Sequence, residues 1–255
     1  MNRNHTSSWL SAYGSIVLLA LVGACAGGDQ KSDAYAEEAW AHFKKMCDAK
    51  AGERIYKSYR GVKSVLVVKP LPTATEKDLF DQYWYGDPYS NASTGDRARL
   101  AAARLTYPDA PIAQGKRGNG FDFVESDESQ NLASGKKLVK YFFSPGQRQV
   151  QSQELATSPV SRFGISWEDI STTADRKYWV AGSRLTITDL TNRTVVAERI
   201  GFLIEGGFGS RAGQRRPWQT AQVMGRGKCP DVHDYSDRWF VLKVLNPNEE
   251  NHDGK

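Results

Sequence analysis

The strongest constraint on the fold is a pair of segments in the second half of the chain in which apolar and polar residues alternate. These segments are residues 178–188 (YWVAGSRLTIT) and 194–205 (TVVAERIGFLIE), and the polar residues 189–193 (DLTNR) separate them. Alternation at a period of two places successive side chains on opposite faces of a strand, and a short polar turn joins two such strands into an antiparallel hairpin. The pattern therefore predicts a β-hairpin and, with it, a domain built around a sheet.

Several other segments also have the character of strands. Three intervening segments do not have this character and are assigned to no strand: residues 76–92 are aromatic but broken by Gly86 and Pro88, residues 108–120 have the composition of a loop, and residues 122–131 (DFVESDESQN) are acidic. Short apolar runs bounded by turn residues, in contrast, are typical of buried strands. The strands predicted on this basis are residues 62–68 (VKSVLVV), 137–143 (KLVKYFF), 162–167 (RFGISW) and 238–245 (RWFVLKVL).

One helix is predicted ahead of these strands, over residues 32–51. Ser32 and Asp33 can cap its start and Gly52 fits its end. Its predicted inner face combines residues at i, i+4, i+7 and i+11, which are Ala36, Trp40, Phe43 and Cys47. Residues 96–105 are Ala-rich and predict either a second helix or a lid.

The chain has 255 residues, a length that suits one large domain or two small ones. No repeat or linker divides it, and its 10 Phe, 11 Tyr and 7 Trp are typical of a folded core rather than of disorder. We therefore predict a single α+β domain over residues 35–246, with an N-terminal helix packed on a mainly antiparallel sheet and a polar tail at 247–255. The net charge of +5 mixes both signs, so no nucleic-acid partner is predicted.

The N-terminus has the features of an export signal. Residues 15–24 (SIVLLALVGA) form an apolar run of ten, too short to cross a bilayer but suited to the core of a signal peptide. The sequence Val22-Gly23-Ala24-Cys25 resembles the lipobox of bacterial lipoproteins. That resemblance implies removal of residues 1–24, acylation of Cys25, a tether over residues 25–34 and a periplasm-facing anchor. By the same resemblance, Ala26 rather than Asp after the cysteine implies sorting to the outer membrane. The alternative is an ordinary secretory signal with an incidental cysteine.

The two remaining cysteines are Cys47 and Cys229. An even pair in an oxidising compartment favours a disulfide, which would close a loop of about 180 residues and join the first helix to a late segment. Two free buried thiols are the alternative.

Motifs for catalysis are absent from the sequence. There is no GxSxG and no HExxH, and the chain after Cys25 holds only His42, His233 and His252. We interpret His42 as a surface or edge histidine of the helix. His233 lies among three aspartates that suggest either a cation site or, in our preferred interpretation, a solvated acidic turn. Gly206, Gly207, Gly209 and Gly213 do not have the spacing of a phosphate-binding loop. The sequence predicts no enzyme, no cofactor and no metal.

Two segments are candidate surfaces for a protein partner, because Arg, Trp and Tyr are enriched at interface hot spots. The first is the Gly/Arg-rich stretch with Phe208, Arg211, Arg215, Arg216 and Trp218, and the second contains Tyr83, Trp84 and Tyr85. The alternatives are a solvated loop with Trp218 in the core, and core packing of the tyrosine cluster.

Two blocks, residues 38–70 and 161–218, resemble a family of proteobacterial periplasmic lipoproteins. Members of that family are encoded beside type VI secretion genes and lipase effectors of the phospholipase class. The resemblance implies an immunity protein that binds and neutralises a cognate secreted effector. The alternatives are a housekeeping envelope lipoprotein that binds a small ligand or a structural partner, and a periplasmic hydrolase without a recognisable motif. The oligomeric state is not predicted.

Overall fold

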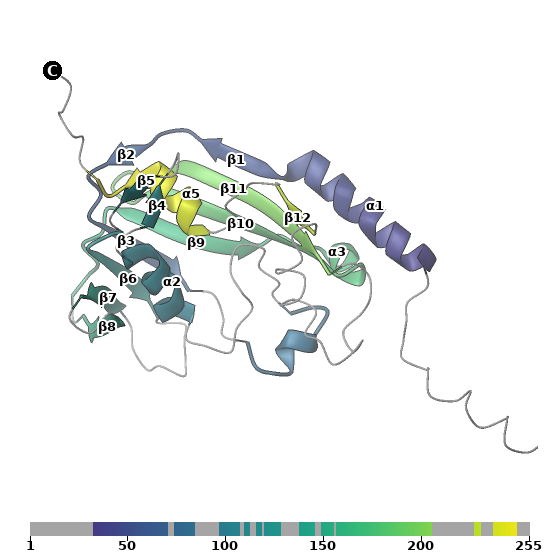
Figure 1. Ribbon diagram of the computed structural model, residues 1–255, viewed down its shortest axis with the longest axis horizontal. Helices are drawn as coiled ribbons and strands as arrows, with labels where there is room; N and C mark the ends of the chain where they lie inside the picture. The colour runs from purple at the N-terminus through teal and green to yellow at the C-terminus, as the bar shows by residue number, and fades with distance from the viewer. Residues whose placement is uncertain are drawn as a thin grey trace, which may run out of the picture.

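The computed structural model describes residues 33–70, 74–84, 97–107, 110–112, 116–118, 120–128, 138–145, 149–155, 157–205, 227–230 and 237–248. These residues form a nine-stranded sheet with helices on both faces (Figure 1). Eight strands follow the order β1-β11-β10-β9-β3-β6-β7-β8, and β12 pairs with the same edge of β11 as β1 does. The strands are β1 (Gly52–Ile55), β3 (Ser64–Lys69), β6 (Phe123–Asp127), β7 (Leu138–Ser144), β8 (Gln149–Glu154), β9 (Phe163–Asp169), β10 (Val180–Asp189), β11 (Thr194–Ile204) and β12 (Lys228–Cys229).

Smaller elements complete the described fold. Two strand pairs lie outside the main sheet, β2 (Tyr59–Arg60) with β13 (Leu245–Asn246), and β4 (Ala110–Ile112) with β5 (Lys116–Gly118). The helices are α1 (Asp33–Lys50), the 3-10 turn η1 (Asp78–Phe80), α2 (Arg97–Thr106), α3 (Thr173–Lys177) and α5 (Asp237–Val244).

The predicted hairpin is confirmed as β10 and β11. The two strands pair antiparallel over their whole length, with Val180 opposite Ile204 and Asp189 opposite Thr194. Gly182 lies opposite Phe202, and a Cβ at Gly182 would come within 2.5 Å of that ring. Glycine at this position therefore lets the aromatic ring pack flat against the neighbouring strand.

Alternation along the hairpin separates two layers. Leu185 of β10 belongs to an apolar cluster with side chains of α2 and α5, whereas Val180, five residues earlier, packs with α1. Because neighbouring side chains on a strand point to opposite faces, α1 covers one face of the sheet and α2 with α5 cover the other. The fold is a single α+β domain, as predicted.

The sheet is mainly antiparallel, with one exception at its centre. Strand β3 pairs parallel with both β6 and β9, and the other strands of the main sheet pair antiparallel. A parallel neighbour requires a crossover, and here the chain returns from the edge strand β8 to β9 through residues 155–162. This return spans four strand spacings, or about 19 Å, which eight extended residues can bridge.

Glu125 holds this crossover against the sheet. Its carboxylate is fully buried and accepts the backbone N–H groups of Val160 and Ser161 at 2.8–3.1 Å. Val124, the preceding residue of β6, packs in the α2–α5 core, so Glu125 points to the opposite face. The crossover therefore lies on the same face as α1. The same face also carries a row of alternating charges across β1, β11, β10 and β9, in which Arg54, Glu198, Arg184 and Glu168 form successive ion pairs.

Glu125 also explains why the sequence pattern missed β6. A strand with acidic residues at 125 and 127 does not have the apolar alternation of a core strand, and we assigned residues 122–131 to no strand. The buried carboxylate is tolerated because backbone donors satisfy it.

The prediction of a strand over 238–245 is wrong, because these residues form α5 and only the start of β13. A short apolar run has no decisive period, so it fits a buried helix as well as a buried strand. Phe240, Val241 and Val244 are fully buried, and their i, i+1, i+4 spacing gives one helix face. Asp237 in the first turn and Lys243 in the last complement the helix dipole.

The predicted first helix is confirmed as α1, but its inner face differs from the prediction. Ala39, Phe43 and Met46 are buried against the sheet, whereas Trp40 keeps 38% of its surface exposed. Trp40 lies at the side of the helix, with its ring edge-on to Phe43 at 5.7 Å. The apolar stripe is therefore rotated by one residue from the one we expected.

The predicted disulfide between Cys47 and Cys229 is present, with the two Cα atoms 5.8 Å apart. It joins the last turn of α1 to β12, across 182 residues of sequence. The chain-entropy description gives on the order of 5 kcal/mol for a loop of this size, whereas disulfides typically stabilise proteins by about 2–4 kcal/mol.

Candidate functional site

The described residues with the most pronounced chemistry form a cluster between α1 and α3. His42 Nε2 lies 2.6 Å from Asp175 Oδ1, and their side chains are 23% and 2% exposed. This pair joins residues 133 positions apart in sequence. The prediction of a surface or edge histidine is therefore too simple, because the imidazole is half-buried and bonded to a buried carboxylate.

Local sequence positions Asp175. Thr172 begins α3 with a capping box, in which the Thr172 hydroxyl accepts the Asp175 backbone N–H and the Asp175 carboxylate accepts the Thr172 backbone N–H at 2.6 Å. Burial opposes ionisation of Asp175 and is the largest influence on its pKa. The hydrogen bonds from Thr172 and His42 together outweigh it, so the pKa lies below its ordinary value.

Aromatic rings complete the cluster. Tyr178 lies 5.1 Å from the His42 ring and 5.7 Å from the Tyr35 ring. The Tyr35 hydroxyl donates to the Lys177 carbonyl, and the Gln82 amide donates to the same carbonyl at 2.8 Å. Burial and the adjacent Tyr178 raise the pKa of Tyr35 to about 12, so its hydroxyl remains a donor near neutral pH. These contacts satisfy the carbonyls at the end of α3 and hold α1 against it.

A histidine hydrogen-bonded to a carboxylate also occurs in the catalytic triads of hydrolases. In a triad the histidine also bonds to a nucleophilic side chain, so the presence or absence of that nucleophile decides whether the pair can act in hydrolysis. Among the residues that the structure describes, no serine, threonine or cysteine side chain is hydrogen-bonded to His42. The second Asp175 oxygen is already occupied by the Thr172 backbone and hydroxyl. The pair therefore acts as a polar contact that joins α1 to α3, and we call His42 and Asp175 together the polar clasp.

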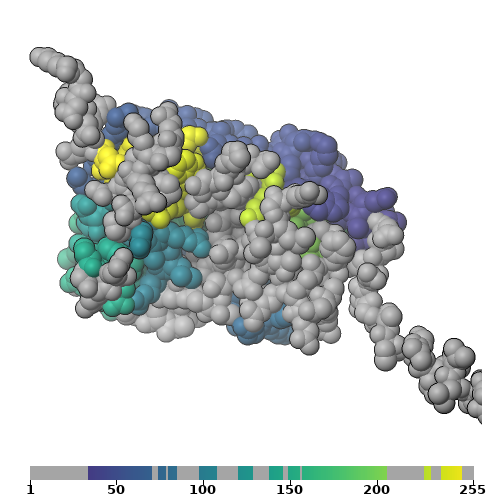
Figure 2. Space-filling view, in the orientation of Figure 1, coloured from purple at the N-terminus to yellow at the C-terminus, as the bar shows by residue number. Residues whose placement is uncertain are grey.

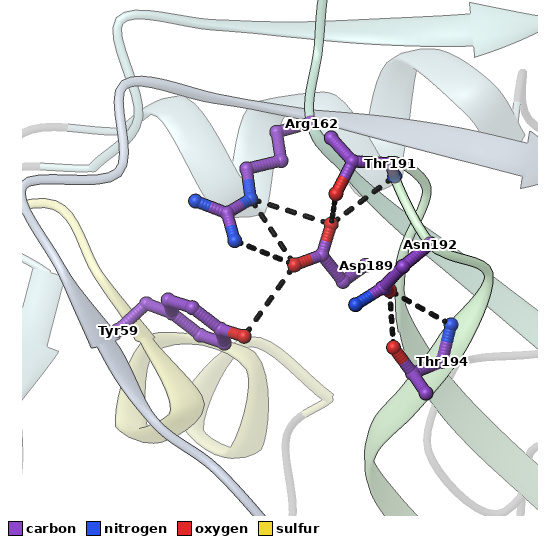
Figure 3. Close-up of polar contacts among 6 residues, drawn as sticks. All are labelled: Tyr59, Arg162, Asp189, Thr191, Asn192 and Thr194. Atoms are coloured by element: carbon purple, nitrogen blue, oxygen red, sulfur yellow. Dashed lines mark hydrogen bonds and ion pairs between the residues drawn. The ribbon is translucent and has the colours of Figure 1, made fainter.

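A second buried carboxylate, Asp189, lies at the end of the hairpin (Figure 3). The Arg162 guanidinium donates to both Asp189 oxygens, with the shortest contact at 2.6 Å, and stacks 5.0 Å from the rings of Tyr59 and Phe163. Thr191 donates its backbone N–H and its hydroxyl to the same carboxylate. The donors from Arg162 and Thr191 hold the pKa of Asp189 well below its usual range. This constellation ties the hairpin turn to the start of β9.

Of the predicted partner-binding residues, the structure describes only Tyr83 and Trp84. Tyr83 is 59% exposed, whereas Trp84 is partly buried against the cluster of Trp179, Ala181 and Leu203. The remaining predicted residues, namely Cys25, Tyr85, Phe208, Arg211, Arg215, Arg216 and Trp218, lie outside the described residues.

The predicted acidic turn is described only in part. Residues 231–236, including His233, lie outside the described ranges, whereas Asp237 is buried with an oxygen 3.6 Å from Arg104 Nη1. The described part of the chain contains no group of three or more His, Cys, Asp or Glu side chains that could hold a metal ion.

An exposed surface that the sequence did not suggest runs from α1 into β1. Residues 54–58 (RIYKS) are all exposed, and Tyr56 exposes 62% of its surface. In the space-filling view, α1 and the segment that follows it form the upper border of the molecule (Figure 2). The sequence signal for this surface was the adjacent pair Ile55 and Tyr56, but the basic residues Arg54 and Lys57 on either side of it concealed these apolar members.

Comparisons with known proteins give no further assignment. No protein-family model, curated protein or solved structure matches the chain. Within the described ranges, no helix combines the length and the apolar character needed to cross a bilayer.

Proposed function

We propose that this protein is a membrane-anchored, periplasm-facing binding protein that neutralises a cognate type VI secreted lipase or phospholipase effector by forming a complex with it. The observation that carries the proposal is the Cys47–Cys229 disulfide. Structural disulfides persist in oxidising compartments, so the bond supports export of the chain. It uses two of the three cysteines, and the third, Cys25, stands in the lipobox-like sequence.

Neutralisation requires binding and no chemistry. An effector that attacks membrane lipid in the periplasm is met at the same membrane by an inhibitor held there through acylated Cys25. Tethering raises the effective concentration of the inhibitor without any new contact. The proposed partner-binding residues remain the Gly/Arg-rich stretch at 208–218 and the aromatic residues at 83–85.

The test is co-expression with a candidate lipase effector directed to the periplasm. We expect the wild-type protein to rescue growth and to copurify with the effector. The variant Arg215→Glu/Arg216→Glu should fold normally but bind the effector more weakly. Failure of both rescue and copurification would overturn the proposal, and unchanged affinity of the double variant would remove residues 215 and 216 from the interface.

The His42–Asp175 pair favours one competing function, a periplasmic hydrolase with His42 as the base. The variant His42→Gln separates the two. An inhibitor that acts by binding still rescues growth when His42 is replaced, whereas a hydrolase that depends on His42 as its general base loses its activity.

A further inference from the structure

The exposed border formed by α1 and β1 has the composition of a surface that contacts membranes. We call it the α1–β1 edge and define it by the exposed side chains of Trp40, Lys50, Arg54, Ile55, Tyr56 and Lys57. Three of these six are basic and three are large and apolar or aromatic. Tyrosine and tryptophan favour the boundary between water and hydrocarbon, where one end of the ring is wet and the other is not.

The described residues leave this edge uncovered. Strand β1 ends the described sheet, and its pairing with β11 uses only one side of its backbone. The backbone N–H of Tyr56 donates to the Val196 carbonyl of β11. Backbone groups alternate in direction along a strand, so those of Arg54 also face β11, whereas those of Glu53 and Ile55 face away from it. No described element covers Ile55 or Tyr56.

Trp40 belongs to the same side of the molecule. Cys47 lies seven residues later, on the same flank of α1, and is bonded to β12 at the outer edge of β11. The opposite flank, with His42, is packed against α3. Although Cys47 on the flank of Trp40 is bonded to β12, Trp40 keeps 38% of its surface exposed.

The charge is unbalanced at the β1 end of the edge, whereas the exposed Glu37 and Glu38 lie near the start of α1. Arg54 is paired with Glu198 at 2.8 Å, and Glu53 is partly buried with Lys243 at 2.9 Å. Within the described residues, neither Lys50 nor Lys57 has a carboxylate partner. Lys57 Nζ lies 5.0 Å from the centre of the Tyr59 ring. Two ammonium groups without a described carboxylate partner, beside exposed apolar side chains, complement an anionic phospholipid surface.

The length of the tether points to the same occupant. Seven residues separate Cys25 from Asp33, the first residue of α1. A chain of that length spans at most about 29 Å, so an acyl anchor on Cys25 keeps the start of α1 close to the bilayer. Helix α1 is about 27 Å long, so the whole α1–β1 edge can reach the membrane when the helix lies along it.

We propose that the α1–β1 edge docks onto an anionic phospholipid bilayer, so that the anchored domain lies on the membrane with its long border rather than swinging freely. This inference rests on the lipid anchor of the proposed function. A bilayer contact of this kind supplies the second signal that stable anchoring uses beside an acyl chain.

The experiment uses the chain from Ala26 onward, without acylation, because every described helix and strand begins at Asp33 or later. The probe is vesicles of phosphatidylethanolamine with phosphatidylglycerol, compared with vesicles of phosphatidylcholine, in a co-sedimentation assay. We expect binding to the anionic vesicles that weakens with added salt, and little binding to the neutral ones.

The variant Lys50→Glu/Lys57→Glu should lower the affinity for anionic vesicles at least about tenfold, since each basic residue near such a surface strengthens binding about fivefold. The matched control is Lys69→Glu/Lys77→Glu, which makes the same charge change at exposed positions in β3 and directly before η1. The control should bind markedly better than the edge variant. Trp40→Ala/Tyr56→Ser should weaken binding while leaving its dependence on salt unchanged.

Equal binding by the edge variant and the control would overturn the proposal, as would equal binding to anionic and neutral vesicles. If the edge variant binds vesicles normally but loses the effector, the edge is a protein interface. No effector and no acyl chain takes part in the vesicle assay, so its failure is distinguishable from a failure of rescue in cells.

Discussion

The two faces of the sheet are covered in different ways. On one face, α2 and α5 share a large apolar cluster with seven strands of the main sheet, β3 and β6 to β11, and are held there mainly by burial. On the other, α1 contributes the buried Ala39, Phe43 and Met46 to a smaller cluster, with Tyr35 and Cys47 partly buried against it. It is also fastened by a disulfide and by the His42–Asp175 clasp. Because the apolar stripe of α1 is narrow, the disulfide and the His42–Asp175 contact supply attachment that apolar packing alone provides less of.

Removing a core side chain on the α5 face should have the largest effect. Phe240 is fully buried in the large cluster, so Phe240→Ala should lower the free energy of unfolding by about 3–5 kcal/mol. Urea denaturation of the oxidised protein measures this loss. Phe43→Ala on α1 is the comparison, and a cost as large as that of Phe240→Ala would contradict the contrast between the faces.

Breaking the disulfide should come next. Cys47→Ser should lower the melting temperature in the oxidised protein, at a cost of about 2–4 kcal/mol, because the unfolded chain regains the freedom that the bond removes. In reductant, wild type and variant should melt together. Identical melting of the two under oxidising conditions would show that the bond does not fasten α1.

Loosening the polar clasp should have a smaller effect. Asp175→Asn weakens the bond to His42 and the capping box of α3, so we expect a loss of about 1–3 kcal/mol at neutral pH. The lowered pKa of Asp175 means that its stabilisation is present above about pH 4 and is lost as the pH falls through the folded-state value. The variant should therefore show a weaker dependence of stability on pH in the acid range, measured by denaturation at several pH values. An unchanged acid profile would contradict this role.

Trp40 should contribute least to stability. Although it touches Phe43, its exposure predicts that Trp40→Ala costs less than about 1 kcal/mol. Thermal melting beside Phe43→Ala tests this difference within a single turn of helix. A loss comparable to that of Phe43→Ala would mean that the inner face of α1 includes residue 40 after all.

Features set by local pattern were predictable from the sequence. The period-two alternation predicted β10 and β11, the helical pattern predicted α1, and the cysteine count predicted the Cys47–Cys229 bond. Features set by distant partners were not predictable. Glu125 is compatible with a central strand only because Val160 and Ser161 reach it, and α5 differs from a strand only through the surface on which it packs.

The same limit applies to the candidate site. His42 and Asp175 are far apart in sequence, and nothing in either local pattern indicates that they meet. The aromatic cluster at 83–85 divides in the structure into an exposed Tyr83 and a partly buried Trp84, which composition could not distinguish. The α1–β1 edge was missed because its apolar members are interrupted by lysine and arginine.

The strand order has a consequence for how the chain reaches its final form. Strand β1 follows directly after α1, yet it pairs with β11, and Cys47 of α1 bonds to Cys229, which lies 182 residues later in the sequence. In a chain synthesised from its N-terminus, the first helix and the first strand have no partner in the sheet until the hairpin of residues 180–204 has formed. The domain therefore closes late, when α1 and β1 at its beginning dock onto β11 and β12 near its end.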